Sequence, residues 1–179
     1  MLSPGASTTP MMADFDERSL VLTGFMGTGK STVGALLATQ LQRPFIDVDE
    51  LIVARTGWPI PDLFARYGEA HFRAIERGVC HEVAVRTGEV VATGGGALVD
   101  DASREVLLRY AFVVCLDADP NTIEARLVGE TGRPLAGEWR ERWQARAPIY
   151  ASLPHHVWTE GRTPQQVAEE VIALWKSES

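Results

Sequence analysis

Short apolar runs alternate along this chain with longer segments in which apolar residues recur every three or four positions. The first apolar run, residues 20–22, precedes a segment with helical spacing at 31–42. The other segments expected as strands are 45–49, 89–92, 112–116 and 157–159. The other segments expected as helices are 60–66, 69–86, 102–109, 120–127, 141–147 and a terminal helix that opens at 163–166. This alternation predicts an α/β fold, in which helices cover both faces of a parallel sheet.

The run Gly24–Ser31 (GFMGTGKS) matches the phosphate-binding P-loop pattern in full. Its glycines let backbone N–H groups turn around a phosphate, and the helix that begins near Lys30 points its positive end there. In this pattern Lys30 reaches the β- and γ-phosphates, and the Ser31 hydroxyl binds Mg²⁺. The run also follows an expected strand and opens an expected helix, which is the context that the pattern requires. It predicts a nucleoside triphosphate site.

Two acidic residues, Asp47 and Asp49, fall at the end of the second expected strand. On an extended backbone, side chains two residues apart face the same way. At the carboxyl end of the strand both would meet the phosphate site. One carboxylate could hold a water on Mg²⁺, and the other could accept a hydrogen bond from a substrate hydroxyl. The alternative is a helix cap or a pair of solvated acids, which the neighbouring P-loop disfavours.

Weaker candidates occur further along the chain. Arg73 and Glu76 are three residues apart on a helix, and a pair with this spacing usually marks only a solvated face. The triplet 94–96 is all glycine, which suits close approach of a ligand to backbone, or a simple flexible turn. Arg133 lies in an expected mobile loop, 128–140, from which it could swing over a transferring phosphate, and Arg146 follows that loop. Taken singly, each arginine is more typical of an ordinary surface residue than of a functional one.

Together these motifs resemble the shikimate kinase family from residue 20 to residue 174. The matching segments are Gly24–Thr32, Asp47-Val48-Asp49, Gly68-Glu69 with Phe72-Arg73 and Glu76, Thr93–Gly96, Arg133-Pro134-Leu135 and Arg146–Tyr150. The alternation of elements and the P-loop together predict a three-layer P-loop kinase fold. We expect five parallel strands in the order 2-3-1-4-5, helices on both faces and a mobile lid.

The resemblance implies an ATP-dependent kinase that transfers the γ-phosphate of ATP to the 3-hydroxyl of shikimate. It implies Mg²⁺ as cofactor, bound by Ser31 and through water by Asp47, and catalytic roles for Lys30, Asp49 and Arg133. The implied ATP contacts are Gly27, Thr28, Gly29, Lys30, Ser31, Thr32, Arg126, Arg133, Arg162 and Pro164. The implied substrate contacts are Asp49, Arg73, Glu76, Gly94, Gly95, Gly96 and Arg146, with Glu76 steering Arg73.

The length and net charge of the chain limit the number of domains and the classes of partner that we expect. The 179 residues suit one domain, which we expect at 19–179 after a disordered leader at 1–18. Within it we expect a substrate-binding region at about 49–86 and a lid at about 128–140. The net charge of −7 argues against a nucleic-acid partner, and no apolar run approaches the ~20 residues of a membrane helix. Cys80 and Cys115 are expected as free thiols, which suits a cytoplasmic protein, and we expect a monomer.

Three other functions compete with this interpretation. A gluconate-type or nucleotide kinase would share the P-loop and lid, but has no reason to combine the paired aspartates, Arg73 and the glycine triplet. A GTPase-like switch needs an Asn-Lys-x-Asp stretch, which is absent because the lysines are at positions 30 and 176. A catalytically inactive homologue used for binding is disfavoured because all the expected catalytic positions are filled.

Overall fold

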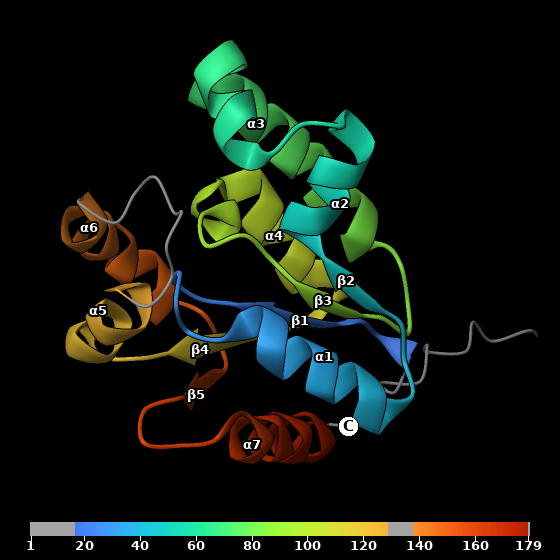
Figure 1. Cartoon of the computed structure of the whole chain (residues 1–179). Coiled ribbons are helices and arrows are strands. Elements are labelled where there is room, and N and C mark those ends of the chain that lie inside the picture. The colour runs from blue at the N-terminus through green and yellow to red at the C-terminus, as the bar shows by residue number, and fades with distance from the viewer. Residues whose placement is uncertain (1–16, 129–137, 179) are drawn as a thin grey trace, which may run out of the picture.

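A parallel five-stranded sheet in the order β2-β3-β1-β4-β5 forms the centre of the protein (Figure 1). The computed structural model describes residues 17–128 and 138–178. The strands are β1 (Leu20–Thr23), β2 (Phe45–Asp47), β3 (Val90–Ala92), β4 (Phe112–Asp117) and β5 (His156–Trp158). Every pairing between neighbouring strands is parallel. The predicted strand order is therefore confirmed.

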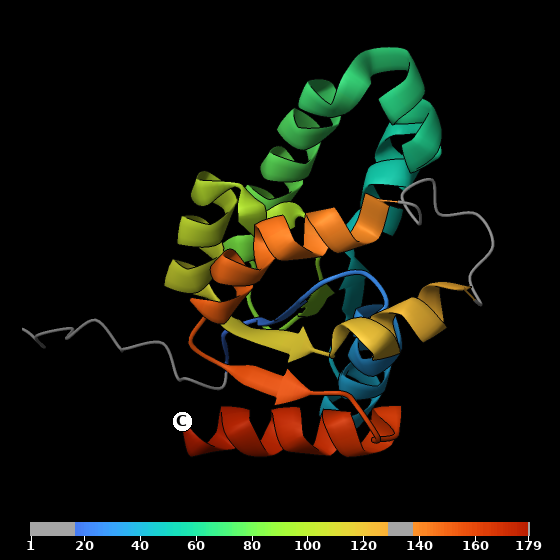
Figure 2. The same cartoon turned by 90° about the vertical axis from the view of Figure 1, so that its left-hand side faces the viewer.

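Helices cover both faces of this sheet, as predicted (Figures 1 and 2). They are α1 (Lys30–Leu41), α2 (Val48–Thr56), α3 (Ile60–Ala84), the short 3₁₀ helix η2 (Ala97–Val99), α4 (Asp101–Tyr110), α5 (Pro120–Val128), α6 (Trp139–Ala151) and α7 (Pro164–Ser177). Helices α1 and α7 lie on one face; α2, α3, α4 and α6 lie on the other. None of these described helices is long and apolar enough to cross a membrane.

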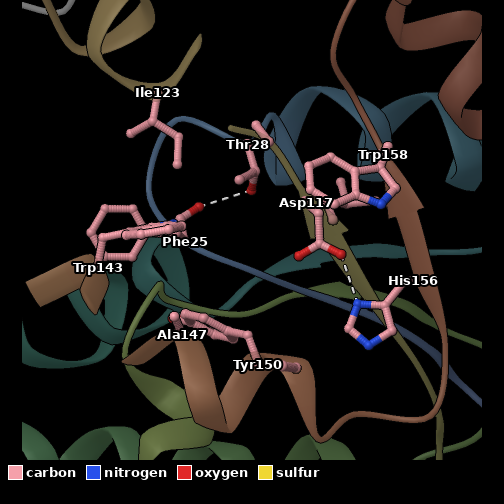
Figure 3. Close-up of a pocket in the computed structure, with 12 residues that line it drawn as sticks. Phe25, Thr28, Asp117, Ile123, Trp143, Ala147, Tyr150, His156 and Trp158 are labelled. Carbon is pink, nitrogen blue, oxygen red and sulfur yellow. Dashed lines mark hydrogen bonds and ion pairs between the residues drawn. The ribbon is translucent and has the colours of Figure 1, made fainter. Parts of the chain in front are cut away.

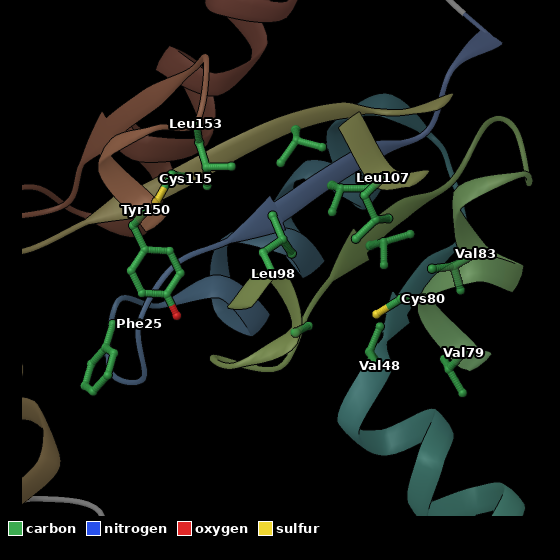
Figure 4. Packing of buried hydrophobic residues seen from close by; sticks show 14 of the residues in the cluster. Phe25, Val48, Val79, Cys80, Val83, Leu98, Leu107, Cys115, Tyr150 and Leu153 are labelled. Carbon is green, nitrogen blue, oxygen red and sulfur yellow. The ribbon is translucent and has the colours of Figure 1, made fainter. Parts of the chain in front are cut away.

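The strands divide their side chains between two hydrophobic cores, because successive residues of a strand point to opposite faces. Leu20 and Leu22 join the core beneath α1 and α7, whereas Val21 joins the core beneath α2, α3 and α4. Val113 and Val114 divide in the same way on β4. Figure 4 shows the second of these cores. A strand that is buried on both faces must be apolar throughout, which is why the sequence shows continuous apolar runs.

Helix α1 approaches β2 closely at Gly34. A Cβ atom added there would lie 2.5 Å from a ring carbon of Phe45, so no larger residue fits without movement. Glycine inside a helix is about 1 kcal/mol less favourable than alanine. The glycine that this close contact requires therefore lowers the intrinsic stability of α1. The close approach brings Ser31, one turn earlier on α1, beside the end of β2.

The predicted strand 45–49 is wrong at its end. Strand β2 stops at Asp47 and helix α2, which the sequence did not predict, begins at Val48. The cause is the Asp47 side chain, whose Oδ1 accepts the backbone N–H of Asp49 at 3.0 Å and of Glu50 at 3.3 Å. These bonds cap α2, so Asp49 lies in the first turn of a helix and not on an extended strand.

Two other local predictions have mixed outcomes. The break expected near Gly68 is confirmed, because α3 leaves helical geometry there, with φ 79 and ψ 169. The loop expected at 128–140 is too long at both ends, because Val128 belongs to α5 and Trp139 begins α6. Residues 129–137 and 1–16, which include most of the predicted lid and leader, lie outside the described residues.

Candidate active site

The P-loop connects the end of β1 to the start of α1, as predicted. Gly24 has a φ of 131°, and a Cβ there would lie 2.3 Å from the carbonyl oxygen of Leu116, so only glycine fits. The loop carbonyl of Phe25 accepts hydrogen bonds from Lys30 Nζ at 2.8 Å and from Thr28 Oγ1 at 2.8 Å. The amino group of Lys30 therefore lies across the loop that would hold the phosphates.

The Ser31 hydroxyl meets the Asp47 carboxylate at the carboxyl edge of the sheet. Ser31 Oγ donates a hydrogen bond of 2.6 Å to Oδ2 of Asp47. Hydroxyl and carboxylate oxygens are the hard ligands that Mg²⁺ prefers, and Mg²⁺ usually keeps several waters beside one or two protein oxygens. The residues present therefore fit the predicted metal site beside the P-loop.

The glycine triplet is the point on which three predicted substrate residues converge. A Cβ at Gly94 would lie 2.7 Å from Oε1 of Glu76 and 2.8 Å from Oδ1 of Asp49. A Cβ at Gly96 would lie 2.7 Å from Nη1 of Arg73. The absence of side chains from the triplet is what lets these charged groups approach its backbone.

The Arg73–Glu76 pair is not the solvated pair that its spacing also allowed. Arg73 Nη1 contacts Glu76 Oε2 at 2.5 Å, and Glu76 is only 2% exposed. Burial raises the pKa of Glu76, an effect that Arg73 opposes by favouring the charged carboxylate. Glu69 also contacts Arg73, at 3.3 Å. Two carboxylates therefore fix the direction of the Arg73 guanidinium.

Helix α6 reaches the glycine triplet from the other side. Arg146 Nη1 donates a hydrogen bond of 2.9 Å to the Gly95 carbonyl, and the Tyr150 hydroxyl donates to the same oxygen. A Cβ at Gly95 would lie 3.2 Å from the backbone nitrogen of Met26 in the P-loop. The predicted substrate residues and the predicted phosphate loop are thus in direct contact.

The predicted adenine residues divide into two groups. Arg126 Nη1 donates to the carbonyl of Gly27 at 2.9 Å and to the hydroxyl of Thr159 at 3.1 Å, so it lies at the P-loop. Arg162 instead pairs with Glu170 of α7, and Pro164 is the first residue of that helix. Arg133 lies outside the described residues.

Comparison with known proteins settles the family. A family model described as shikimate kinase matches residues 26–176 of the chain. The chain belongs to the shikimate kinase family. A shikimate kinase of Thermodesulfovibrio yellowstonii is 39% identical over 161 residues, which are 87% of this chain and 93% of the relative. One from Symbiobacterium thermophilum is 42% identical over 163 residues, 86% of this chain and 94% of the relative. The resemblance inferred from the motifs is confirmed.

Solved structures agree with this assignment to the shikimate kinase family. The structure of a shikimate kinase from Acinetobacter baumannii in complex with shikimate is similar, with a TM-score of 0.83 and 33% identity, covering 90% of this chain and 94% of that one. A gluconokinase from Sinorhizobium meliloti has a TM-score of 0.56 and 18% identity, covering 89% of this chain and 92% of that one. At that identity the gluconokinase shares the fold alone.

A cluster that the sequence did not reveal lies where β4 pairs with β5, and Figure 3 shows two of its members, Asp117 and His156. Asp117 and Cys115 are two residues apart on β4, and His156 lies opposite Cys115 on β5. His156 Nδ1 is 2.7 Å from Asp117 Oδ2, and its Nε2 is 2.9 Å from the Leu153 carbonyl. The Cys115 thiol, which is buried and free as predicted, lies 3.5 Å from Asp117 Oδ1. We interpret the cluster as a structural link between β4, β5 and the end of α6.

Two hollows lie near the candidate site. One, of about 350 Å³, is lined by Phe25, Asp117, Tyr150 and His156 among others, and lies between α6 and the ends of β4 and β5 (Figure 3). The other, of about 440 Å³, lies between α2 and the start of α3 and is lined by Asp49. The second hollow is therefore the one that adjoins a predicted substrate residue.

Proposed function

We propose that this member of the shikimate kinase family transfers the γ-phosphoryl group of ATP to the 3-hydroxyl of shikimate. The products are shikimate 3-phosphate and ADP. The observation that carries the proposal is the convergence of Asp49, Arg73 and Glu76 on a glycine triplet that contacts the P-loop. That arrangement supplies charged groups for an anionic, hydroxyl-bearing substrate directly beside a phosphate site.

Arg73 and Arg146 are the proposed holders of the shikimate carboxylate. A planar guanidinium can donate two parallel hydrogen bonds to a carboxylate, which fixes both its position and its orientation. Glu76 holds Arg73 in place, as their 2.5 Å contact supports. Asp49 would accept hydrogen bonds from the ring hydroxyls, including the 3-hydroxyl, and aim that oxygen at the γ-phosphorus. Phosphoryl transfer asks mainly for such positioning and for stabilisation of charge.

The nucleotide side is assigned to residues 27–32. Their backbone N–H groups would surround the β- and γ-phosphates, and Lys30 would move from the Phe25 carbonyl to the phosphate oxygens. Ser31 would ligate Mg²⁺ directly and Asp47 through a water; bound Mg²⁺ would neutralise charge on the phosphates. By family resemblance Arg133 would stabilise the transferring group.

The remaining assignments concern adenine and the state of the protein. Arg126 is the adenine-side residue with the strongest support, because it already contacts the P-loop carbonyl of Gly27. Arg162 and Pro164 are proposed for the same side on family resemblance. That the protein is a monomer in the cytoplasm, with no nucleic-acid or membrane partner, stays a prediction.

A coupled ADP-release assay tests the substrate. With Mg²⁺ and ATP present, we expect release that depends on shikimate and is at background level with gluconate or nucleoside monophosphates. ADP release that depends on one of those alternatives, and not on shikimate, would contradict the proposal. Detection of shikimate 3-phosphate by mass spectrometry confirms that the phosphoryl group reaches the acceptor and not water.

A further inference from the structure

One carbonyl oxygen, that of Gly95, accepts hydrogen bonds from two side chains of the same helix. Arg146 and Tyr150 are four residues apart on α6, so they lie on one face of it, one turn from each other. Arg146 belongs to the proposed substrate site, whereas Tyr150 has no role there so far. The Tyr150 side chain is buried, with 5% of its surface exposed, and its ring belongs to the hydrophobic core between α6 and the sheet (Figure 4).

The position of the Gly95 carbonyl controls the groups on either side of it. The neighbouring backbone at Gly94 packs against Asp49 and Glu76, and that at Gly96 packs against Arg73. Gly95 itself packs against the backbone of Met26 in the P-loop. A rotation of the Gly95–Gly96 peptide would therefore disturb both the proposed shikimate groups and their distance from the phosphate loop.

Tyr150 is better suited than Arg146 to hold this carbonyl in every state of the catalytic cycle. In the proposed function the Arg146 guanidinium must also bind the substrate carboxylate, so its hydrogen bonds change when shikimate binds. The Tyr150 ring is packed in the hydrophobic core, and its hydroxyl donates to the Gly95 carbonyl. Burial raises the pKa of Tyr150 to about 12, so the hydroxyl keeps its proton at neutral pH.

We propose that Tyr150 is a positioning residue for shikimate, which fixes the glycine triplet by holding the Gly95 carbonyl and does not touch the substrate itself. This inference rests on the proposed function. Because a small misplacement of binding groups weakens both affinity and alignment, removal of the hydroxyl should act on shikimate far more than on ATP. The Arg146 hydrogen bond would remain, so the effect should be partial.

The test is Tyr150→Phe, which removes one oxygen atom and keeps the ring. We expect the KM for shikimate to rise about tenfold, the value of one buried hydrogen bond, while the KM for ATP stays within about twofold. The matched control is Tyr110→Phe at the exposed end of α4, where Tyr110 is 48% exposed. This control should leave both constants unchanged.

A purely structural role would give a different result. If Tyr150→Phe lowers the melting temperature but leaves the KM for shikimate unchanged, or raises both KM values equally, the inference is wrong. Should the phenylalanine variant not fold, Tyr150→His and Tyr150→Leu replace it, since histidine keeps an N–H donor and leucine has none. The inference requires a lower KM for shikimate with histidine than with leucine; equal values would overturn it.

Failure of the proposed function would be seen separately. The unchanged chain is assayed first, and absence of shikimate-dependent ADP release would overturn the function and this inference with it. If that activity is present and the Tyr150 variants bind shikimate normally, only the role of Tyr150 is wrong. Shikimate-induced stabilisation against heat gives the affinity of each variant without relying on turnover.

Discussion

The hydroxyl of Ser31 donates to Oδ2 of Asp47 over 2.6 Å and so joins the first turn of α1 to the end of β2. The other oxygen of the same carboxylate, Oδ1, caps helix α2 by accepting the N–H of Asp49. A single side chain thus combines a structural contact with a proposed metal contact. The carboxylates of Asp47 and Asp49 have different proposed roles, so substitution of each should have a different effect.

Asp47→Asn should lower activity in a way that raised Mg²⁺ partly restores. Asparagine caps helices about as well as aspartate, so we expect stability to change little. It lacks the charge that would hold a metal-bound water, so the Mg²⁺ requirement should increase. A Mg²⁺ titration of shikimate-dependent ADP release checks this, with thermal unfolding as the measure of stability. An unaltered Mg²⁺ dependence would remove Asp47 from the metal site.

Asp49→Asn should lower kcat severely, with ATP binding nearly intact and no rescue by Mg²⁺. The variant keeps the shape of the side chain and some hydrogen bonding but loses the negative charge that orients the acceptor hydroxyl. The same Mg²⁺ titration, with ATP affinity measured separately, distinguishes it from Asp47→Asn. Rescue of Asp49→Asn and not of Asp47→Asn would reverse the two assignments.

Lys30→Met should abolish phosphoryl transfer while the fold survives. The amino group of Lys30 is the point charge assigned to the phosphates, and loss of one such group costs at least about a hundredfold in rate. ADP release measures the loss, and circular dichroism with thermal unfolding checks the fold. Turnover near that of the unchanged protein would rule out the assigned role.

Gly94→Ala should disable the shikimate side of the site. Its methyl group would come within 2.8 Å of both Glu76 Oε1 and Asp49 Oδ1, so one or both carboxylates must move. We expect a large rise in the KM for shikimate and little change in the KM for ATP. The control is Gly78→Ala within α3, where a Cβ would meet no described atom within 4 Å other than the neighbouring backbone of its own helix. Alanine there should raise stability by about 0.5–1 kcal/mol and leave both constants unchanged.

Asp100→Asn should make the free energy of unfolding depend less on pH in the acidic range. Hydrogen bonds from Arg77 lower the pKa of Asp100 to about 2, helped by the bond from the Ser103 backbone. Because this value lies below the ordinary 3.8, the carboxylate stabilises the fold above about pH 4 and loses that contribution as pH falls toward 2. Arg77 is half exposed, so solvent screening should keep the contribution small. Urea unfolding at pH 6 and at pH 3 should show a difference between variant and unchanged protein that shrinks at the lower pH; a constant difference would contradict the role.

The sequence was most informative where a single short segment determines both its own backbone conformation and its chemical role. The P-loop, the positions of the strands and the break at Gly68 depend on glycines and apolar runs that can be read without knowledge of distant residues. The strand order is not local in this sense, and it was predicted only through the P-loop kinase fold. The convergence of Arg73 and Arg146 on one glycine triplet is different, because 73 residues separate them in sequence. No local pattern shows that α3 and α6 face each other across it, and only the family resemblance predicted it.

The failures have specific physical causes. Asp49 was expected on a strand because alternation continues through Asp47, but the Asp47 carboxylate satisfies the backbone of the next turn and starts a helix. The link between Asp117 and His156 depends on the register of two neighbouring parallel strands, which a sequence pattern does not state. His155 and His156 are both half-buried, His156 because of that link and His155 because it stacks on Phe112.

Gly34 determines how closely the two sides of the proposed metal site approach each other. The side chain it lacks would occupy the space in which Phe45 meets α1, and Phe45 is two residues before Asp47 on β2. Ser31 is one turn before Gly34 on α1. The distance between the two proposed magnesium contacts, Ser31 and Asp47, therefore depends on how closely α1 approaches β2 at Gly34. Any residue with a Cβ at position 34 would push α1 away from β2. The distance from Ser31 to Asp47 would then increase, and so would the opening into which a hydrated magnesium ion must fit.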